Sequence, residues 1–318
     1  MPKHLFSQVD VFSSEPMRGN PVAVVHDAID DEGNDLSVEV MQAFARWTNL
    51  SETTFVLPAR DTDADYRLRI FTPGGELPFA GHPTLGSCRA WLAVGGVPRD
   101  EHVIVQECAA GLVRVRRSGE SLAFAAPPLT RFEAPDDGLR SGVIPALGVS
   151  AGQVKDMSWV VNGPNWLGVL LKDAQTVLNL RPDFAAITAL AEVEIGGVEI
   201  GVIGPYAAGA SGQPAPADFE VRAFCPGFGM DEDPVTGSLQ AGLAQWLIGS
   251  GVAPGSYVAA QGTVLERAGR VSIDAEPANS GKTHDASDHN GALVDPSEMD
   301  IWVGGDAVLR IAGAVDLS

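Results

Sequence analysis

The sequence predicts an α/β (α+β) protein made of two pseudo-symmetric lobes, because one strand–loop–helix pattern occurs twice. One copy runs from Arg69-Ile70-Phe71-Thr72-Pro73 to His82-Pro83-Thr84-Leu85-Gly86-Ser87, and the other from Arg222-Ala223-Phe224-Cys225-Pro226 to Asp233-Pro234-Val235-Thr236-Gly237-Ser238. In each copy a strand pattern ends at proline, a glycine-bearing loop follows, and small and hydroxyl residues open a helical pattern. The offsets differ by two residues, since 69 to 82 is 13 and 222 to 233 is 11, which favours an internal repeat. We therefore expect two helix N-termini at one cleft, with His82 and Asp233 in corresponding places.

Length and composition are compatible with two lobes. The chain has 318 residues and is 45% apolar, which is enough core for one large or two medium domains. The pair Pro127-Pro128 closes a run of strand signals and is our candidate boundary. The predicted N-terminal lobe covers residues 1–127, with residues 306–318 as a candidate addition to it. The predicted C-terminal lobe covers residues 128–305.

The charge balance limits the partners. Lysine and arginine total 21 against 41 aspartate and glutamate, a net charge of −20, which argues against nucleic acid and anionic membranes as partners. We expect no membrane partner, because neither a signal segment nor a stretch long enough to span a bilayer is recognisable. Cys88, Cys108 and Cys225 have neither CxxC spacing nor an even count, so a disulfide framework is not expected. A cytoplasmic location fits these features.

Hydrophobic periodicity assigns elements to the first 125 residues. A helix is expected from about Ser37 to Thr48, with Asp35 or Ser37 as its cap. The segment Asn49-Leu50-Ser51-Glu52 follows, which places Glu52 at a helix-to-strand junction. A second helix, the one that His82 precedes, ends before Gly95-Gly96. The strands expected in this half cover residues 5–12, 20–26, 53–57, 66–71, 103–107, 112–117 and 121–125.

The second half repeats this rhythm. Helices are expected over residues 184–191 and 236–248. The expected strands cover residues 159–161, 167–172, 198–203 and 219–224, and short strands follow from Tyr257 onward. The stretches Pro205–Ala217 and Glu276–Asp300 are rich in small and polar residues, so we expect exposed loops there.

Glu52 is the first candidate acid/base. A carboxylate at a junction between apolar segments is desolvated in its charged form, which raises its pKa toward values useful for proton transfer near neutrality. Alternatively, Glu52 caps the Thr53-Thr54 backbone or pairs with an arginine, as structural carboxylates often do. The residue pattern leaves both readings open.

The helix entries supply the other candidates. His82 lies between Gly81 and Pro83 just ahead of a helix, so its ring can point into the cleft while nearby N–H groups remain free for an anion; alternatively, it is a structural histidine. Asp233 occupies the corresponding place in the second repeat, or it serves only as an N-cap. Gly237 and Ser238 open the second helix, either as ordinary initiation residues or as donors for a carboxylate. An anionic substrate is compatible with the net charge, because distant surface carboxylates are screened.

Three segments of the chain resemble the signatures of a known family. They are Asn49 to Val56, Arg69 to Thr84 and Glu232 to Ser238, followed later by Gln261-Gly262 and Val303-Gly304-Gly305. On these residues the chain resembles PhzF-like isomerases, relatives of the phenazine-biosynthesis enzyme that share the diaminopimelate-epimerase fold. The resemblance implies two similar α/β lobes, each a curved, mainly antiparallel sheet around a central helix, with the active site between them.

The resemblance also implies residue roles. It makes Glu52 the acid/base that takes a proton from one substrate carbon and returns one elsewhere. It makes His82 and Asp233 contacts to polar substrate groups that help to steer the proton, so the catalytic set is Glu52, His82 and Asp233. The substrate-binding set is Ser51, Gly81, His82, Gly237 and Ser238. A homodimer is usual for such relatives and is expected here.

No metal or organic cofactor is expected. His284-Asp285 and Asp288-His289 suggest a metal cluster, but they lie in the loop-like stretch after residue 276. Gly95-Gly96 and Gly304-Gly305 lack the spacing of nucleotide-binding loops. Cys88 and Cys225 are interpreted as core or incidental residues, which disfavours a two-cysteine racemase.

The predicted function is a cofactor-independent isomerase. Glu52 would move a proton between carbons of a small, carboxylate-bearing, cyclic or unsaturated substrate held between helix N-termini. One alternative is an epimerase, racemase or dehydratase of amino-acid-like substrates that uses Glu52 as the lone base. The other is a binding protein that has kept the fold without turnover.

Overall fold

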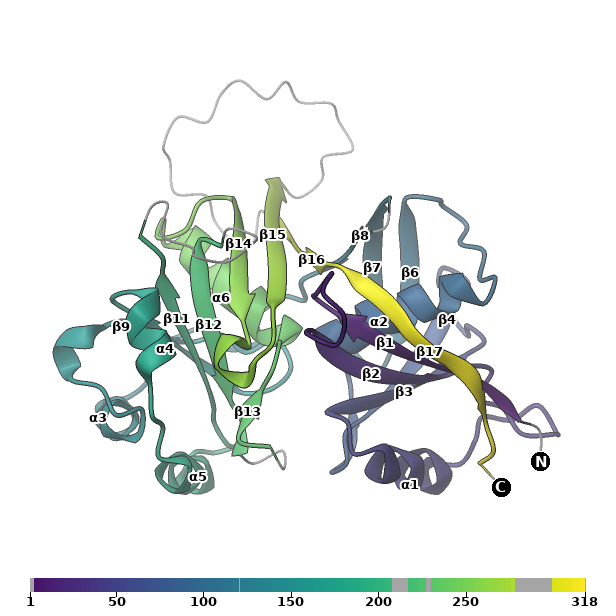
Figure 1. The fold of residues 1–318 in the computed structure, drawn as a ribbon, viewed down its shortest axis with the longest axis horizontal. Coiled ribbons are helices and arrows are strands. Elements are labelled where there is room, and N and C mark those ends of the chain that lie inside the picture. The colour runs from purple at the N-terminus through teal and green to yellow at the C-terminus, as the bar shows by residue number, and fades with distance from the viewer. Residues whose placement is uncertain (1–2, 120, 208–216, 227–229, 278–298, 318) are drawn as a thin grey trace.

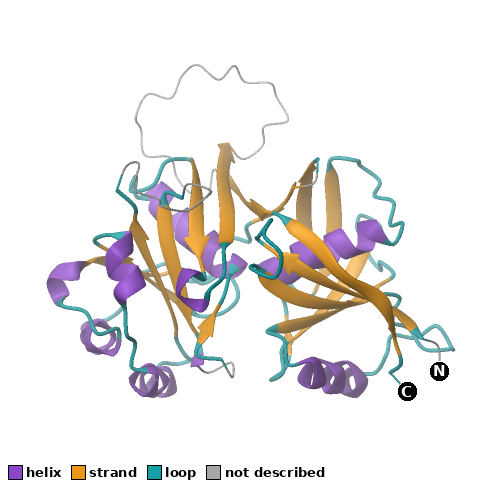
Figure 2. Ribbon diagram, viewed as in Figure 1, coloured by secondary structure: helices purple, strands orange, loops and turns teal. Residues whose placement is uncertain are grey.

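The chain folds into two lobes that lie side by side (Figure 1). The computed structural model describes residues 3–119, 121–207, 217–226, 230–277 and 299–317. Each lobe wraps strands around one central helix, α2 (Gly81–Ala93) in the N-terminal lobe and α6 (Gly237–Gly249) in the C-terminal lobe (Figure 2). In the described part of the chain, the strands of both lobes form one continuous sheet of 17 strands.

In the N-terminal lobe, the strands lie in the sheet largely in the order in which they occur in the chain. They are β1 (His4–Val11), β2 (Asn20–Val25), β3 (Glu52–Leu57), β4 (Tyr66–Phe71), β5 (Glu76–Leu77), β6 (Val103–Cys108), β7 (Gly111–Ser118) and β8 (Ser121–Ala125). The pair β1–β2 is antiparallel, β2–β3 parallel, β3–β4 antiparallel, β4–β6 parallel, and β6–β7 and β7–β8 antiparallel. Helix α1 (Val38–Thr48) packs against β3 and β4.

The C-terminal lobe repeats this order of pairing. Its strands are β9 (Val154–Trp159), β10 (Trp166–Leu171), β11 (Glu199–Pro205), β12 (Phe219–Phe224), β13 (Glu232–Asp233), β14 (Ser256–Gln261), β15 (Gly269–Pro277) and β16 (Met299–Gly305). The pair β9–β10 is antiparallel, β10–β11 parallel, β11–β12 antiparallel, β12–β14 parallel, and β14–β15 and β15–β16 antiparallel. Both lobes are therefore mainly antiparallel sheets of one topology, which confirms the predicted fold class.

Strand pairing and loop hydrogen bonds hold the lobes together. Strand β8 pairs with β16 across the seam, and the last strand, β17 (Ala307–Val315), returns to pair with β1. On the other side, the loop before β2 bonds the start of β15: the Ala268 N–H donates to the Arg18 carbonyl at 2.7 Å, and the Arg270 N–H to the Phe12 carbonyl at 2.7 Å. The division at residues 127 and 305 remains a prediction.

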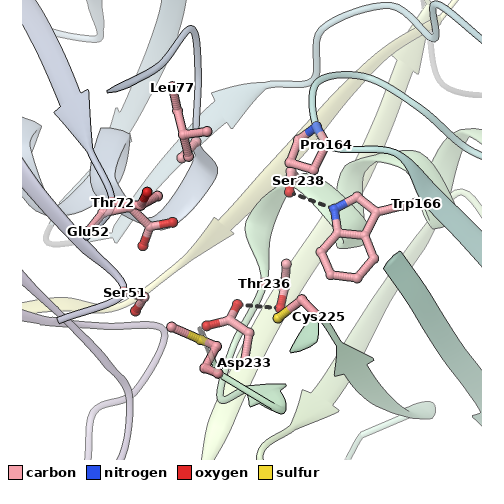
Figure 3. Close-up of a pocket in the computed structure, with 12 residues that line it drawn as sticks. Ser51, Glu52, Thr72, Leu77, Pro164, Trp166, Cys225, Asp233, Thr236 and Ser238 are labelled. Atoms are coloured by element: carbon pink, nitrogen blue, oxygen red, sulfur yellow. Dashed lines mark hydrogen bonds between the residues drawn. The ribbon is translucent and has the colours of Figure 1, made fainter. Parts of the chain in front are cut away.

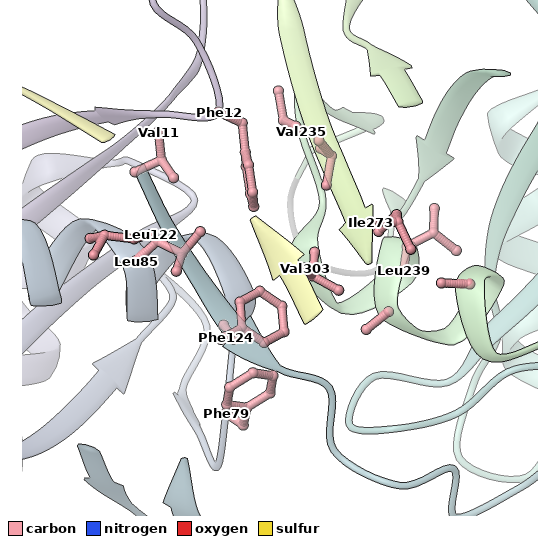
Figure 4. Packing of buried hydrophobic residues seen from close by; sticks show 14 of the residues in the cluster. Val11, Phe12, Phe79, Leu85, Leu122, Phe124, Val235, Leu239, Ile273 and Val303 are labelled. Atoms are coloured by element: carbon pink, nitrogen blue, oxygen red, sulfur yellow. The ribbon is translucent and has the colours of Figure 1, made fainter. Parts of the chain in front are cut away.

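The main hydrophobic core crosses from one lobe to the other. Figure 4 shows side chains of both lobes meeting around β16, with Phe12, Phe79 and Phe124 on one side and Val235 and Leu239 on the other. At its centre the two central helices touch end to end. A Cβ added to Gly81 would lie 2.8 Å from the Gly237 Cα atom, so only glycine permits this approach.

Most expected elements are confirmed, and the errors have physical reasons. Ser37 is the N-cap of α1, and its side chain accepts from the Val40 N–H, whereas Asp35 pairs with Arg67. The strand expected over residues 159–161 is β9, which ends at Trp159. The helix α3 (Asp137–Ala146) was not expected, because it contains two glycines and a proline, Pro145, near its end. The helices α4 (Ala174–Asn179) and α5 (Phe184–Val193) complete this lobe; only α5 was expected.

Two expectations lie partly outside the described residues. Strand β11 extends into the loop expected at residues 205–217, and β15 and β16 extend into the loop expected at residues 276–300. The remainder is mostly not described. Residues 284–289, which carry the suggested metal cluster, are not described. In the described part of the chain, no helix is long and apolar enough to cross a membrane.

Candidate active site

A cavity lies between the lobes, beside the point where the two central helices meet (Figure 3). Its volume is about 50 Å³, which is space for a few water molecules. Figure 3 shows the N-terminal lobe on one wall and the C-terminal lobe on the other. The lining residues are Ser51, Glu52, Thr72, Leu77, Ala80, Pro164, Trp166, Cys225, Met230, Asp233, Thr236 and Ser238.

The structure brings the predicted site residues together. Ser51, Glu52, Asp233 and Ser238 line the cavity. Nε2 of His82 lies 3.3 Å from Oε2 of Glu52. The remaining two, Gly81 and Gly237, form the contact between the helices. Their roles in binding and catalysis remain proposals.

Glu52 begins β3, directly after the turn that leaves α1. Burial raises the pKa of its carboxyl group well above the ordinary value, the negative charge of Asp233 raises it further, and the neighbouring Ser51 side chain acts in the opposite direction. Oε2 of Glu52 is buried and has no hydrogen-bond partner among the described residues. A carboxyl group in this state can hold a proton near neutral pH and exchange it with a ligand.

His82 is a neutral neighbour of this carboxyl group. Burial lowers the pKa of its ring to about 3, while a hydrogen bond to the Pro21 backbone raises it slightly. Nδ1 of His82 lies 3.3 Å from the side-chain nitrogen of Asn20, and the roles of the two ring nitrogens depend on the tautomer. His82 lies within the first turn of α2, one residue after the helix begins at Gly81. The expectation that it precedes the helix is therefore wrong.

Asp233 ends the short strand β13 and faces Glu52 across the cavity. Burial raises the pKa of its carboxyl group to about 6, against hydrogen bonds from Thr236 and Asn20 that lower it. The alternative reading of Asp233 as an N-cap is wrong, because the N-cap of α6 is Thr236. The Thr236 hydroxyl instead donates to the Asp233 carboxylate.

The two repeats align differently from the prediction. Arg69 pairs with Glu76 as Arg222 pairs with Glu232. Each glutamate stands opposite a phenylalanine of the preceding strand and five residues before the glycine that begins the helix. The counterpart of His82 is therefore Ser238, and the counterpart of Asp233 is Leu77. The predicted equivalence of His82 and Asp233 is wrong.

Two helix ends supply free donors beside the cavity. The N-caps of α2 and α6 are Ala80 and Thr236, and neither makes a side-chain capping bond. The first backbone N–H groups of an uncapped helix are unsatisfied, and the macrodipole places about half a positive charge there. The N–H groups of Gly237 and Ser238 are therefore available to an anionic group. Among the described residues, no arginine or lysine lines the cavity.

Asn20, which was not among the predicted site residues, joins the two lobes at the site. Its side chain is fully buried and donates to Asp233 Oδ1 at 3.0 Å and to the Val235 carbonyl at 2.9 Å. The Ser51 hydroxyl donates to its carbonyl oxygen at 3.1 Å. One signal was available, since asparagine is unfavourable in strands and yet opens β2.

Cys225 is also placed differently from the expectation. It is buried, as expected, but it lines the cavity. Burial and then the charge of Asp233 raise the pKa of its thiol well above the ordinary value, so the thiol is a poor base at neutral pH. Cys88 is a core residue, as expected.

We expect Asp233→Asn to flatten the dependence of stability on pH. The carboxyl group binds its proton up to about pH 6 in the folded state and only to about 3.8 when unfolded. Its contribution is therefore complete below the unfolded value and is lost as pH rises through about 6. The wild type should lose about 1 kcal/mol more than the variant between pH 5 and 7.5. Urea unfolding at both pH values measures this difference, and equal losses in the two proteins would contradict the raised pKa.

Comparisons with known proteins identify relatives over most of the chain. A family model for phenazine biosynthesis-like proteins, PhzC-PhzF, matches residues 9–295. The chain is 38% identical to antisense-enhancing sequence 1 of Schizosaccharomyces pombe, over 86% of this chain and 92% of that protein. It is 35% identical to the trans-2,3-dihydro-3-hydroxyanthranilate isomerase of Pseudomonas aeruginosa, over 76% of this chain and 78% of that enzyme.

Solved structures show the same fold. A phenazine biosynthesis protein of the PhzF family from Enterococcus faecalis superposes with a TM-score of 0.72 at 25% identity, covering 99% of this chain and 100% of that one. A probable proline racemase from Agrobacterium radiobacter superposes with a TM-score of 0.60 at 14% identity, covering 99% and 93%. The second likeness concerns the fold alone. The chain belongs to the PhzC-PhzF family of phenazine biosynthesis-like proteins and is an isomerase.

Proposed function

We propose that this isomerase moves a proton between two carbons of a small, carboxylate-bearing, cyclic or unsaturated substrate, with Glu52 as the acid/base. The observation that carries the proposal is the state of the Glu52 carboxyl group. It lines the interlobe cavity, its Oε2 atom lacks a hydrogen-bond partner among the described residues, and burial raises its pKa well above the ordinary value. Such a group is suited to proton transfer near neutral pH.

The proposed reaction balances without a co-reactant. The Glu52 carboxylate takes a proton from one substrate carbon, and the C–H electron pair becomes part of a new double bond. The existing double bond shifts, and its electrons take a proton from the Glu52 carboxylic acid at another carbon. The substrate and its isomer have the same composition, and Glu52 returns to its first state. His82 and Asp233, which both lie near Glu52, would contact polar substrate groups and steer the proton.

The site supports a small anionic substrate. Its charge would be met by the N–H groups at the start of α6 and by the Ser238 hydroxyl. Leu77, Pro164 and Met230 supply apolar contacts. One relative is named for action on trans-2,3-dihydro-3-hydroxyanthranilate, a cyclic diene carboxylate. That compound is the first substrate to test.

Solvent exchange tests the function directly. The enzyme is incubated in D₂O with trans-2,3-dihydro-3-hydroxyanthranilate and with other cyclohexadiene carboxylates, and the products are followed by NMR and mass spectrometry. We expect a shifted double bond and deuterium at the carbon that is reprotonated. Inversion at an α-carbon without a double-bond shift would instead favour the epimerase alternative. No exchange with any of these compounds would favour a binding protein.

The proposal also describes a cytoplasmic homodimer that needs no metal or organic cofactor. Light scattering should give about twice the 33.2 kDa of one chain. Exhaustive dialysis against a chelator should leave the exchange rate unchanged. A monomeric mass would contradict the first expectation, and loss of exchange that added metal restores would contradict the second.

A further inference from the structure

The Ser238 hydroxyl has a second protein contact that bears on its role. The Trp166 indole Nε1–H donates to Ser238 Oγ at 3.1 Å, and the bond is buried (Figure 3). The Asn162 side chain donates to the Ser238 backbone carbonyl at 3.1 Å. Two residues from the segment around the start of β10 therefore hold the first turn of α6.

The direction of the tryptophan bond is fixed by chemistry. An indole N–H can only donate, whereas a serine hydroxyl has one proton to donate and two lone pairs that accept. Because Trp166 donates to Oγ, the Ser238 proton remains for another acceptor. No hydrogen-bond acceptor for this proton is present among the described residues. The Ser238 oxygen lines the cavity, so the free proton is available to a ligand there.

The symmetry of the lobes shows that this bond is not part of the shared scaffold. Trp166 stands beside Glu199 in the β10–β11 pair, as Val22 stands beside Glu52 in the β2–β3 pair. The first-turn residue of α2 at the place of Ser238 is His82. In the N-terminal lobe, valine offers no hydrogen to that residue. The donor pair Trp166 and Ser238 therefore distinguishes the C-terminal wall of the cavity from the N-terminal wall.

We propose that Trp166 is a positioning residue that orients the Ser238 hydroxyl as a hydrogen-bond donor to the carboxylate of the substrate, together with the N–H groups at the start of α6. This inference rests on the proposed function and assigns the anionic end of the substrate to the C-terminal wall. The carbon that exchanges its proton then faces Glu52 on the opposite wall. Orienting the hydroxyl before binding reduces the ordering cost of binding.

Binding of benzoate to the full-length protein tests the inference without turnover. Trp166→Phe keeps an aromatic ring and removes the N–H. We expect it to weaken benzoate binding about fivefold to tenfold, as for loss of one hydrogen bond to a charged group. Ser238→Ala should weaken binding by a similar factor, and the double variant should be no weaker than Ser238→Ala alone. In turnover assays the effect should fall mainly on KM and little on kcat.

Trp302→Phe is the matched control. Its indole Nε1 atom is buried and has no hydrogen-bond partner among the described residues, and Trp302 lies on the seam in β16, where it is not among the residues lining the cavity. Trp302→Phe removes the same atoms as Trp166→Phe but breaks no hydrogen bond among the described residues, so benzoate binding should stay within twofold of the wild type. Unchanged binding in Trp166→Phe, or additive losses in the double variant, would overturn the inference. So would a wild type that does not bind benzoate.

An NMR readout does not depend on ligand or on the stability of Trp166→Phe. In protein labelled with ¹⁵N-tryptophan, the Trp166 indole signal is the one that should move most when Ser238 is replaced by alanine. Addition of benzoate to the wild type should move it again. If Ser238→Ala leaves all the tryptophan indole signals unchanged, the inference is overturned. Benzoate binding without solvent exchange would leave this subsite intact and reject the isomerase proposal, so the two failures are distinguishable.

Discussion

Glu52→Gln is expected to abolish solvent-deuterium exchange into the substrate while benzoate binding stays within a few fold of the wild type. Glutamine keeps the size of the side chain but cannot take up and return a proton. General acid–base catalysis contributes about 10²–10⁴-fold, and here one group would perform both transfers, so a loss of at least about 10³-fold is expected. The measurement is the rate of deuterium incorporation in D₂O. Exchange at the wild-type rate would remove Glu52 from the mechanism.

The chain contains a matched control for this substitution. Glu199 begins β11 as Glu52 begins β3, and each pairs with the topologically equivalent neighbouring strand, β10 or β2. Burial raises its pKa to about 7, but it is not among the residues that line the cavity. Glu199→Gln therefore removes a second buried carboxyl group, at the topologically equivalent position of the other lobe. We expect its exchange rate to stay within a few fold of the wild type, and an equal loss in both variants would indicate a structural effect.

The repeat and the junction at Glu52 could be predicted because they depend on local pattern. Strands that end at a proline and helices that begin with glycine leave direct marks in the sequence. The placement of Glu52 followed from the end of the helix at residue 48 and the apolar run that begins at residue 53. For the same reason the strand at Tyr66–Phe71 was located without error.

The exact equivalence of the two halves could not be predicted. The resemblance of His-Pro-Thr to Asp-Pro-Val aligned His82 with Asp233, whereas strand register aligns His82 with Ser238. Register depends on cross-strand pairs, here Phe71 with Glu76 and Phe224 with Glu232, which sequence similarity does not reveal. The roles of Asn20 and Trp166 likewise depend on contacts between segments 72 or more residues apart.

The two lobes share a scaffold but present different chemistry to the cavity. The N-terminal wall holds Glu52, the proposed acid/base, and Nε2 of His82 lies 3.3 Å from its Oε2 atom. The C-terminal wall holds Ser238 with its tryptophan donor and the open end of α6. Asn20 crosses between the walls and bonds Asp233. In the proposed mechanism, proton transfer and anion binding occupy opposite halves, and the distance between them depends on how closely the two helices meet.

Gly237→Ala is expected to disrupt both stability and activity by separating those halves. An added Cβ would lie 2.9 Å from the Gly81 Cα atom and 3.1 Å from the His82 nitrogen. Both atoms belong to the backbone, which cannot move aside as a flexible side chain can. We expect a loss of about 1–3 kcal/mol in the free energy of unfolding. Displacement of the walls by about 1 Å should also reduce the exchange rate by about 10²-fold.

Gly313→Ala separates this effect from the general cost of replacing a glycine. Gly313 lies in β17, and an added Cβ would meet no atom within 4 Å, so stability and exchange should remain close to wild type. Urea unfolding and deuterium exchange are measured on both variants. If Gly237→Ala retained wild-type exchange, the chemistry would not require the close contact of α2 and α6. If Gly237→Ala lost exchange but kept its stability and bound benzoate normally, the distance between the walls would control proton transfer alone. That result is the one expected if the C-terminal wall binds the anion.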